Sequence, residues 1–249
     1  MKQCVMSNPT NTTPQASSGG KKEQMQQMFN RIAPSYDKLN HILTFNIDRG
    51  WRKRGVKLVQ EGDPKRILDL ATGTADLAIY MAQRMVESSV VGVDLSSEML
   101  EVGRQKVTAA RLSERICLVE GDAEALAFDD GSFDAVTVAF GIRNFARLAL
   151  CFKEMHRVLG EGGRVMILEL STPQNQLVRW CYELYAFRFI PFLGGLIARD
   201  KAAYRYLPNS IRAFHAPQRV VEMMQEAGFT QVKKERKCFG IAHIYMAQK

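Results

Sequence analysis

The segment Ile67-Leu68-Asp69-Leu70-Ala71-Thr72-Gly73-Thr74-Ala75-Asp76 decides the fold class of this 249-residue chain. An apolar run of strand length passes through small residues into a stretch with helical spacing, which predicts a buried strand, a tight turn and a helix. A second apolar run, Val90-Val91-Gly92-Val93-Asp94, ends in an acid about twenty residues after the turn. This order predicts that Asp94 lies at the tip of the neighbouring strand, where open α/β sheets bind ligands.

Short β-rich runs and helical stretches continue to alternate after this segment. The expected strands are 66–70, 90–94, 116–119, 133–140, 164–170, 230–234 and 242–247. Helices are expected near 75–86, 148–159 and 218–227, and Ser96 is suited to cap another. The alternation predicts an α/β fold, with a parallel sheet covered by helices on both faces.

The flanking regions differ from this alternating unit. Residues 1–20 are rich in Ser, Thr, Asn, Gln, Gly and Pro and predict a disordered tail before a single domain at 21–249. Residues 21–60 predict an N-terminal helical cap, broken near Pro34 and Gly50. Residues 173–217 are aromatic and basic and predict an inserted helical lid over a pocket. No apolar run reaches the length of a transmembrane helix.

Composition limits the cellular compartments and the kinds of partner that are expected for the chain. The net charge of +8 favours an anionic partner, and charge alone does not choose between nucleic acid and an acidic membrane surface. The five cysteines are scattered without a C-x-x-C pair, which argues against a disulfide framework and a zinc site. We therefore expect no metal and a reducing, cytoplasmic location.

The turn after the first strand indicates which nucleoside the sheet binds. Ala71 stands where a dinucleotide-binding turn has its first glycine, no third glycine follows Gly73, and no P-loop is present. A pyrophosphate needs more backbone donors than this turn offers. S-adenosylmethionine (SAM) carries no phosphate, and the carboxylate of Asp94 can accept bonds from both ribose hydroxyls. After the third strand, Asp122 and the backbone N–H of Ala123 are suited to the adenine ring.

This order of motifs resembles the class I SAM-dependent methyltransferases. Other segments resemble the ubiquinone/menaquinone biosynthesis C-methyltransferases (the UbiE/MenG type). They are Tyr36–Asn40, Asp48–Arg52, Phe140–Asn144, Arg157–Leu159 with Gly162–Ser171, Tyr204–Ile211 and Ala227–Phe229. The likeness covers the chain from about Met25 to its end. The chain departs from the family pattern at Ala75, Ala139 and Gly160-Glu161, and the change at Ala139 puts one SAM contact in doubt.

The resemblance implies a class I methyltransferase fold, with a seven-stranded, mostly parallel sheet and helices on both faces. It also implies SAM-dependent methylation of a ring carbon of a prenylated quinol, most simply demethylmenaquinol. It implies S-adenosyl-L-methionine as cofactor, with contacts from Asp69, Ala71, Gly73, Thr74, Asp94, Leu95, Met99, Asp122, Ala123 and Ala139. The expected partners are the lipid quinol, the inner face of the membrane as a peripheral contact, and a second copy of the chain in a homodimer.

Carbon methylation needs alignment of the reacting atoms and a group that takes or relays the proton of the quinol hydroxyl. Arg143 and Asn144 follow the fourth strand, and Arg143 is expected to stabilise the quinolate or to orient a water. Tyr36, Asp37 and His41 form a second catalytic group if the N-terminal helix folds over the pocket. The aromatic residues between 177 and 197 are expected to cover the isoprenoid tail and to approach the membrane.

Other interpretations remain open at the level of sequence. Asp94 is also suited to cap a helix, and Arg143 to pair with a helix end. The substrate is alternatively the benzoquinol precursor of ubiquinone, another small molecule or RNA. No RNA-binding module is visible, and the Asn-Pro-Pro-Tyr motif that accompanies methylation of base nitrogens is missing. A non-catalytic assembly protein of the quinone pathway is the alternative from a different class.

Overall fold

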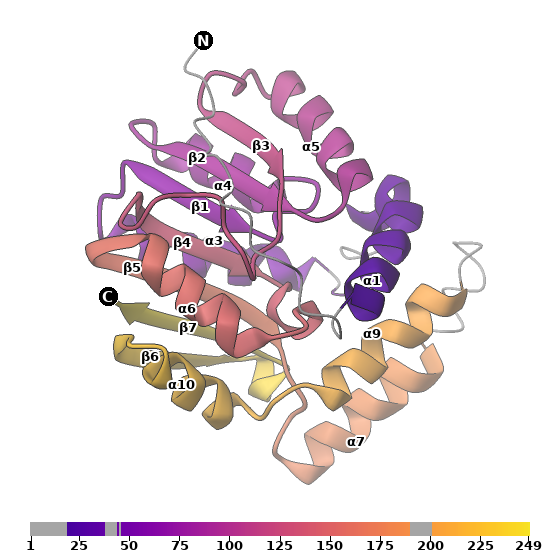
Figure 1. The fold of residues 1–249 in the computed structure, drawn as a ribbon. Coiled ribbons are helices and arrows are strands. Elements are labelled where there is room, and N and C mark those ends of the chain that lie inside the picture. The colour runs from indigo at the N-terminus through magenta and orange to yellow at the C-terminus, as the bar shows by residue number, and fades with distance from the viewer. Residues whose placement is uncertain (1–18, 38–43, 45, 190–200) are drawn as a thin grey trace.

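A computed structural model describes residues 19–37, 44, 46–189 and 201–249, and its centre is a seven-stranded sheet (Figure 1). The strands are β1 (Arg66–Leu70), β2 (Ser89–Asp94), β3 (Ile116–Glu120), β4 (Phe133–Ala139), β5 (Leu159–Leu170), β6 (Thr230–Lys237) and β7 (Ala242–Gln248). Their order across the sheet is β3-β2-β1-β4-β5-β7-β6. β7 pairs antiparallel with both β5 and β6, and the other four strand pairs of this sheet are parallel, so the predicted mostly parallel sheet is confirmed.

Helices precede β1 and lie in each of the connections between strands except that from β3 to β4. They are α1 (Gly19–Ile32), η1 (Ala33–Ser35), α3 (Ile47–Gln60), α4 (Asp76–Arg84), α5 (Ser97–Ala109), η2 (Ile142–Asn144), α6 (Leu148–Val158), α7 (Gln176–Leu184), η3 (Tyr185–Phe189), α9 (Lys201–Ala213), α10 (Pro217–Glu226) and η4 (Cys238–Gly240). Ser96 caps α5 as predicted, since its hydroxyl accepts the N–H of Met99 at 3.2 Å.

Three predicted boundaries were wrong. Gly50 lies inside α3 and does not break it, because a glycine in a helix costs only about 1 kcal/mol and the burial of neighbouring Trp51 and Val56 offsets that. Helix α1 begins at Gly19, within the predicted tail. Strand β5 begins at Leu159 rather than Arg164, because it continues through the two glycines.

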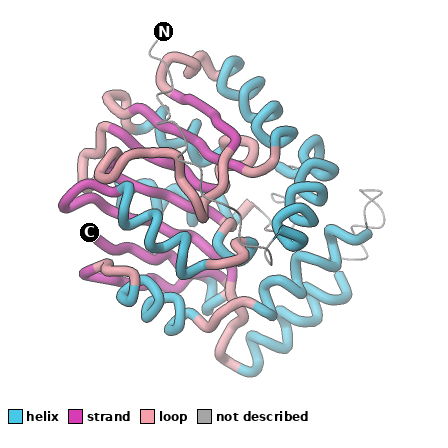
Figure 2. Tube along the Cα trace, in the orientation of Figure 1, coloured by secondary structure: helices cyan, strands magenta, loops and turns pink. Residues whose placement is uncertain are grey.

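The core has two layers, one on each face of the sheet. Leu68 and Leu70 of β1 pack in one cluster with α6 and α10, whereas Ile67 packs in the other with α3 and α4. Alternate residues of a strand point to opposite faces, so a strand that is apolar throughout serves both layers. Figure 2 shows the helices on either side of the sheet.

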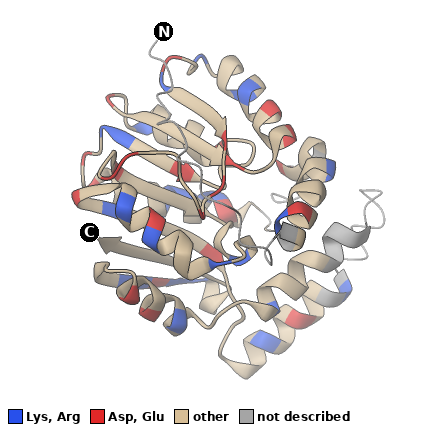
Figure 3. Ribbon diagram, in the orientation of Figure 1, with Lys and Arg blue, Asp and Glu red and all other residues tan. Residues whose placement is uncertain are grey.

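The carboxyl ends of the parallel strands face α1, α7 and α9 (Figure 1). The segment predicted as an inserted helical lid, 173–217, contains α7, η3 and α9; residues 190–200 of that prediction lie outside the described residues. Within the described chain, no helix is long and apolar enough to cross a bilayer. Basic and acidic side chains are interspersed along α6 and α10 (Figure 3), so no continuous basic track runs along these two helices.

Candidate functional site

A pocket opens where β1 and β2 end, and the carboxylate of Asp94 is fixed at its centre. Oδ2 accepts the N–H of Gly73 at 2.8 Å and Oδ1 accepts the N–H of Ser96 at 2.9 Å. Burial raises the pKa of Asp94, while these backbone donors act in the opposite direction. A carboxylate oxygen has two lone pairs, so each oxygen retains capacity for a further donor such as a ribose hydroxyl.

The loop around this carboxylate is held in an unusual backbone conformation. Ala71 and Ala75 have φ values of 49° and 66°, and Phe140 at the end of β4 has a φ of 62°. The left-handed region costs a non-glycine residue roughly 1–2 kcal/mol, so the surrounding contacts must enforce it. Gly141 allows β1 and β4 to end close together, because a Cβ at this position would lie 2.6 Å from the Cβ of Ala71.

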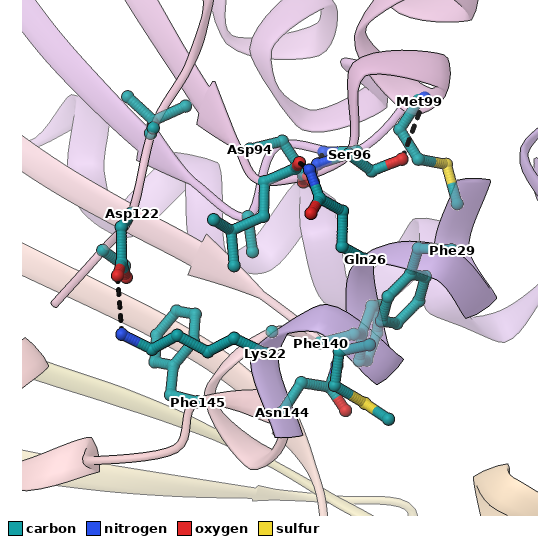
Figure 4. A pocket seen from close by; sticks show the side chains of 18 of the residues that line it. Lys22, Gln26, Phe29, Asp94, Ser96, Met99, Asp122, Phe140, Asn144 and Phe145 are labelled. Carbon is teal, nitrogen blue, oxygen red and sulfur yellow. Dashed lines mark hydrogen bonds and ion pairs between the residues drawn. The ribbon is translucent and has the colours of Figure 1, made fainter. Parts of the chain in front are cut away.

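Helix α1 closes one side of the pocket (Figure 4). Lys22 Nζ lies 2.6 Å from Asp122 Oδ2 and 2.7 Å from Glu124 Oε2, and Gln26 Nε2 donates to the carbonyl of Leu95 at 2.7 Å. Burial acts to raise the pKa of Glu124, but hydrogen bonds from Lys22 and Arg147 lower it overall. The N-terminal helix is therefore tied to the loops that follow β2 and β3.

The structure brings most of the predicted cofactor residues together. Those that line the pocket are Ala71, Gly73, Asp94, Leu95, Met99, Asp122, Ala123 and Ala139. Asp69 and Thr74 do not line it. Asp69 is buried beneath the loop, where it accepts the hydroxyls of Thr72 and Thr137 at 2.7 and 2.6 Å. Burial raises the pKa of Asp69 to about 6.

A second, mostly apolar pocket adjoins the first and encloses about 1240 Å³ including its open mouth. Phe140 is the one described residue that lines both pockets. The walls of the second pocket are Thr44, Ile47, Asp48, Trp51, Phe140, Arg143, Leu170, Val178, Cys181, Tyr182, Tyr185, Ala186, Leu207, Pro208, Ile211, Cys238 and Ile241. The lid contributes through α7, η3 and α9, so an apolar ligand here lies beneath the lid and beside the first pocket.

Arg143 carries a buried positive charge in the wall of this apolar pocket. Its Nη1 donates to Glu169 Oε1 and to the carbonyl of Phe140, both at 2.6 Å. Its Nε is buried and has no hydrogen-bond partner. Burial acts to lower the pKa of Arg143, but the charge of Glu169 raises it overall, so the guanidinium stays ionised.

The other predicted catalytic residues are divided between different locations. Asn144 and Tyr36 line the first pocket, and Asn144 Oδ1 accepts the hydroxyl of Tyr206 from α9 at 2.7 Å. Asp37 lies outside both pockets, where it pairs with Lys106 at 2.6 Å and accepts the hydroxyl of Thr74. His41 lies outside the described residues.

Several site residues were not predicted from the sequence. They are Lys22, Gln26, Glu124, Glu169, Tyr206 and, as a pocket residue, Asp48. Glu169 carried one usable signal: it is an acid within the otherwise apolar run Val165–Leu170, and such an acid is rarely buried unless it is paired. Lys22 and Gln26 carried no such signal, because their role depends on where α1 packs against loops that are distant in the sequence.

Comparisons with known proteins agree with this geometry. A model of the ubiE/COQ5 methyltransferase family matches residues 17–249. The chain is 48% identical to a demethylmenaquinone methyltransferase of Thermus thermophilus, covering 89% of this chain and all of that protein. It is 43% identical to a demethylmenaquinone methyltransferase of Bacteroides fragilis, covering 95% of this chain and 96% of the relative. A ubiquinone/menaquinone biosynthesis C-methyltransferase of Geotalea uraniireducens is 44% identical, with 92% and 97% covered.

Solved structures share the fold at much lower identity. The [4+2]-cyclase SpnF aligns with a TM-score of 0.71 at 15% identity, covering 92% of this chain and 96% of that one. A SAM-dependent methyltransferase from Aquifex aeolicus aligns with a TM-score of 0.57 at 15% identity, covering 78% and 88%. These likenesses establish the class I methyltransferase fold. The match of the family model over nearly the whole chain, with the relatives above, shows that the chain belongs to the ubiE/COQ5 methyltransferase family.

Proposed function

We propose that this chain transfers the methyl group of SAM to a ring carbon of a prenylated hydroquinone, with demethylmenaquinol as the substrate. One observation carries the proposal: a pocket built around Asp94 adjoins an apolar pocket, and Phe140 borders both. The named activities of the Thermus thermophilus and Bacteroides fragilis relatives support the choice of a naphthoquinol ring.

The residues of the first pocket fit SAM. Asp94 has lone pairs for the ribose hydroxyls, and Asp122 offers a carboxylate to the adenine amino group if Lys22 moves aside. Gly73 and Ala71 keep side-chain bulk away from the centre of the pocket. SAM supplies an electrophilic methyl group on a sulfonium.

Arg143 is the residue that we propose stabilises the ionised quinol. A fixed guanidinium favours a developing quinolate because its donors are already in place and the surrounding site is apolar. Its Nε is buried and has no hydrogen-bond partner, so a substrate oxygen reaches this donor only if neighbouring side chains move. Arg143→Ala is expected to lower kcat at least tenfold while the Kd for SAM stays within twofold. Turnover near the wild-type rate in that variant would remove Arg143 from the chemistry.

A test of the function uses the full chain with radiolabelled SAM and chemically reduced demethylmenaquinol. Menaquinol carrying the label is the expected product, and a parallel reaction with the prenylated benzoquinol identifies the ring. Label in the benzoquinol alone contradicts the proposed substrate. Label in neither quinol contradicts the proposed function, provided that calorimetry confirms SAM binding.

Calorimetry also tests the cofactor site. Asp94→Asn removes a charged acceptor worth about 1.5–3 kcal/mol, so the Kd for SAM is expected to rise by roughly 10–150-fold. Asp134→Asn is a matched control, because Asp134 also accepts two backbone N–H groups but lies at the amino end of β4. Equal affinities in the two variants would contradict the assignment of Asp94.

We infer further that the lid faces a membrane surface. Leu177, Trp180 and Leu184 are exposed and share one face of α7, and exposed Ile47 also lines the mouth of the second pocket. A prenyl tail partitions into a bilayer, so an exposed apolar face on a helix that also lines the second pocket shortens the path of the substrate. The predicted homodimer remains a proposal.

A further inference from the structure

Asp48 is a buried carboxylate in the wall of the apolar pocket, and the function proposed above gives it no role. It stands in the first turn of α3, is 1% exposed, and is the only Asp or Glu among the described residues that line this pocket. The other residues with titratable side chains that line this pocket are Arg143, Cys181, Tyr182, Tyr185 and Cys238.

Contacts on both sides fix the position of this carboxylate. Thr44 Oγ1 donates to Oδ1 at 2.6 Å, and Arg52 Nε lies 3.4 Å from Oδ2. The Arg52 guanidinium is 5.1 Å from the ring centroid of Phe140, the residue that borders both pockets. Asp48 is therefore tied, through Arg52, to the boundary between the cofactor pocket and the apolar pocket.

The reaction needs a proton acceptor in this pocket. Arg143 stays ionised and cannot take a proton. Burial raises the pKa of Tyr182 to about 12 and also raises that of Tyr185, so both phenols stay protonated at neutral pH. A carboxylate in an apolar site can serve as a base toward a weakly acidic group when a nearby donor stabilises the resulting anion.

We propose that Asp48 is the general base that removes the hydroxyl proton of the quinol, an inference that rests on the proposed function. As the O–H bond breaks, its proton moves to Asp48 and its electron pair enters the ring. The adjacent ring carbon bonds to the methyl carbon of SAM, and the C–S pair remains on sulfur, giving S-adenosylhomocysteine. The ring carbon then loses its hydrogen as a proton to solvent, which restores aromaticity. Asp48 returns its proton to the oxygen, so one proton is released overall.

A purely structural role for Asp48 makes a different prediction. A carboxylate in the first turn of a helix interacts with the helix dipole, and its i,i+4 pair with Arg52 adds a few tenths of a kcal/mol. On that account, removing the charge lowers stability but leaves the pH dependence of turnover unchanged.

The test compares wild type with Asp48→Asn, using SAM and chemically reduced demethylmenaquinol with a short prenyl tail. Loss of a general base is expected to lower kcat by about 10²–10⁴-fold. The Kd for SAM and the KM for the quinol are expected to stay within about threefold. The remaining rate of Asp48→Asn should rise about tenfold per pH unit, because only quinol already ionised in solution reacts. Wild type should be nearly independent of pH over the same range.

Two further variants keep the test decisive. Asp48→Glu retains a carboxylate, so its turnover is expected to be slower than that of wild type but equally independent of pH. This variant also tests the inference if Asp48→Asn fails to fold. Asp63→Asn removes an exposed acid beside Lys65 and should change nothing. A kcat for folded Asp48→Asn within threefold of wild type overturns the inference, as does a steep pH profile in Asp48→Glu. Wild type that methylates neither quinol contradicts the proposed function itself.

Discussion

Nη1 of Arg143 lies 2.6 Å from Oε1 of Glu169, and the two side chains are 7% and 1% exposed. Glu169 also accepts the backbone N–H of Arg143 and that of Leu170. The carboxylate therefore holds both the side chain and the backbone of Arg143. Removing one partner of such a buried pair leaves a charge without compensation, which makes the pair testable.

Glu169→Gln is expected to lower the free energy of unfolding by about 3–5 kcal/mol, because the Arg143 charge remains buried without its counterion. Urea denaturation measures this change. Glu235→Gln is the control, since Glu235 pairs with Arg54 where both side chains are substantially exposed, and such pairs contribute about 0–1 kcal/mol. Equal losses in the two variants would show that burial does not strengthen the Arg143 pair.

Tyr206→Phe is expected to lower kcat about fivefold, because the hydroxyl that orients Asn144 contributes roughly 1 kcal/mol. Burial raises the pKa of Tyr206, so the hydroxyl remains a donor at neutral pH. Tyr80→Phe on α4 serves as control, since its ring contacts Arg84 and Tyr80 lines neither pocket. Initial rates with saturating SAM measure the effect. If Tyr206→Phe turns over at the normal rate while Asn144→Ala is slow, the contribution of Asn144 does not depend on its hydrogen bond to Tyr206.

Asp69 is expected to make stability depend on pH. Its pKa in the folded protein is about 6, above the ordinary value of 3.8, so the folded state binds the proton more tightly than the unfolded chain. Ionised Asp69 therefore destabilises the fold above about pH 6, and this cost, roughly 3 kcal/mol, disappears as pH falls toward 4.

The measurement for Asp69 is the difference in unfolding free energy between wild type and Asp69→Asn at several pH values. Burial lowers the pKa of His243 to about 4, and this acts in the opposite direction over the same range. Taking the difference cancels that contribution. The wild type should gain relative to Asp69→Asn as pH falls from 7 to 4. A constant difference would contradict the raised pKa.

Trp180→Glu is expected to weaken binding to vesicles of phosphatidylethanolamine and phosphatidylglycerol by at least tenfold. An aromatic ring that becomes buried in the bilayer contributes about 1.5–3 kcal/mol to binding, and the glutamate loses that contribution. Val86→Glu is a matched control: Val86 is 67% exposed and Trp180 63%, but Val86 lies just before β2, at the amino end of the sheet. Vesicle flotation measures the bound fraction. Equal retention of both variants, or no binding by wild type, would contradict docking through α7.

The fold could be predicted because its signals are local. The alternation of apolar strands with helices depends on neighbouring residues, and so does the turn that places Asp94. For the same reason, eight of the ten predicted cofactor residues line the pocket, at the ends of predicted strands or within the first turn of α5. The spacing of residues along a turn does not reveal whether a side chain points into the pocket or into the protein behind it. Asp69 and Thr74 therefore have partners outside the pocket.

The sequence by itself determined the mostly parallel sheet, the acid at the tip of its second strand and the helical segment inserted after β5. Only the tertiary structure decided that Lys22 reaches Asp122, that Glu169 holds Arg143, and that Asp48 lines the same pocket as Arg143. The physical reason is the distance along the sequence over which each kind of interaction acts. Backbone geometry and side-chain periodicity act over a few residues, whereas these contacts join residues between 26 and about 100 positions apart, which meet only when the elements that carry them pack together.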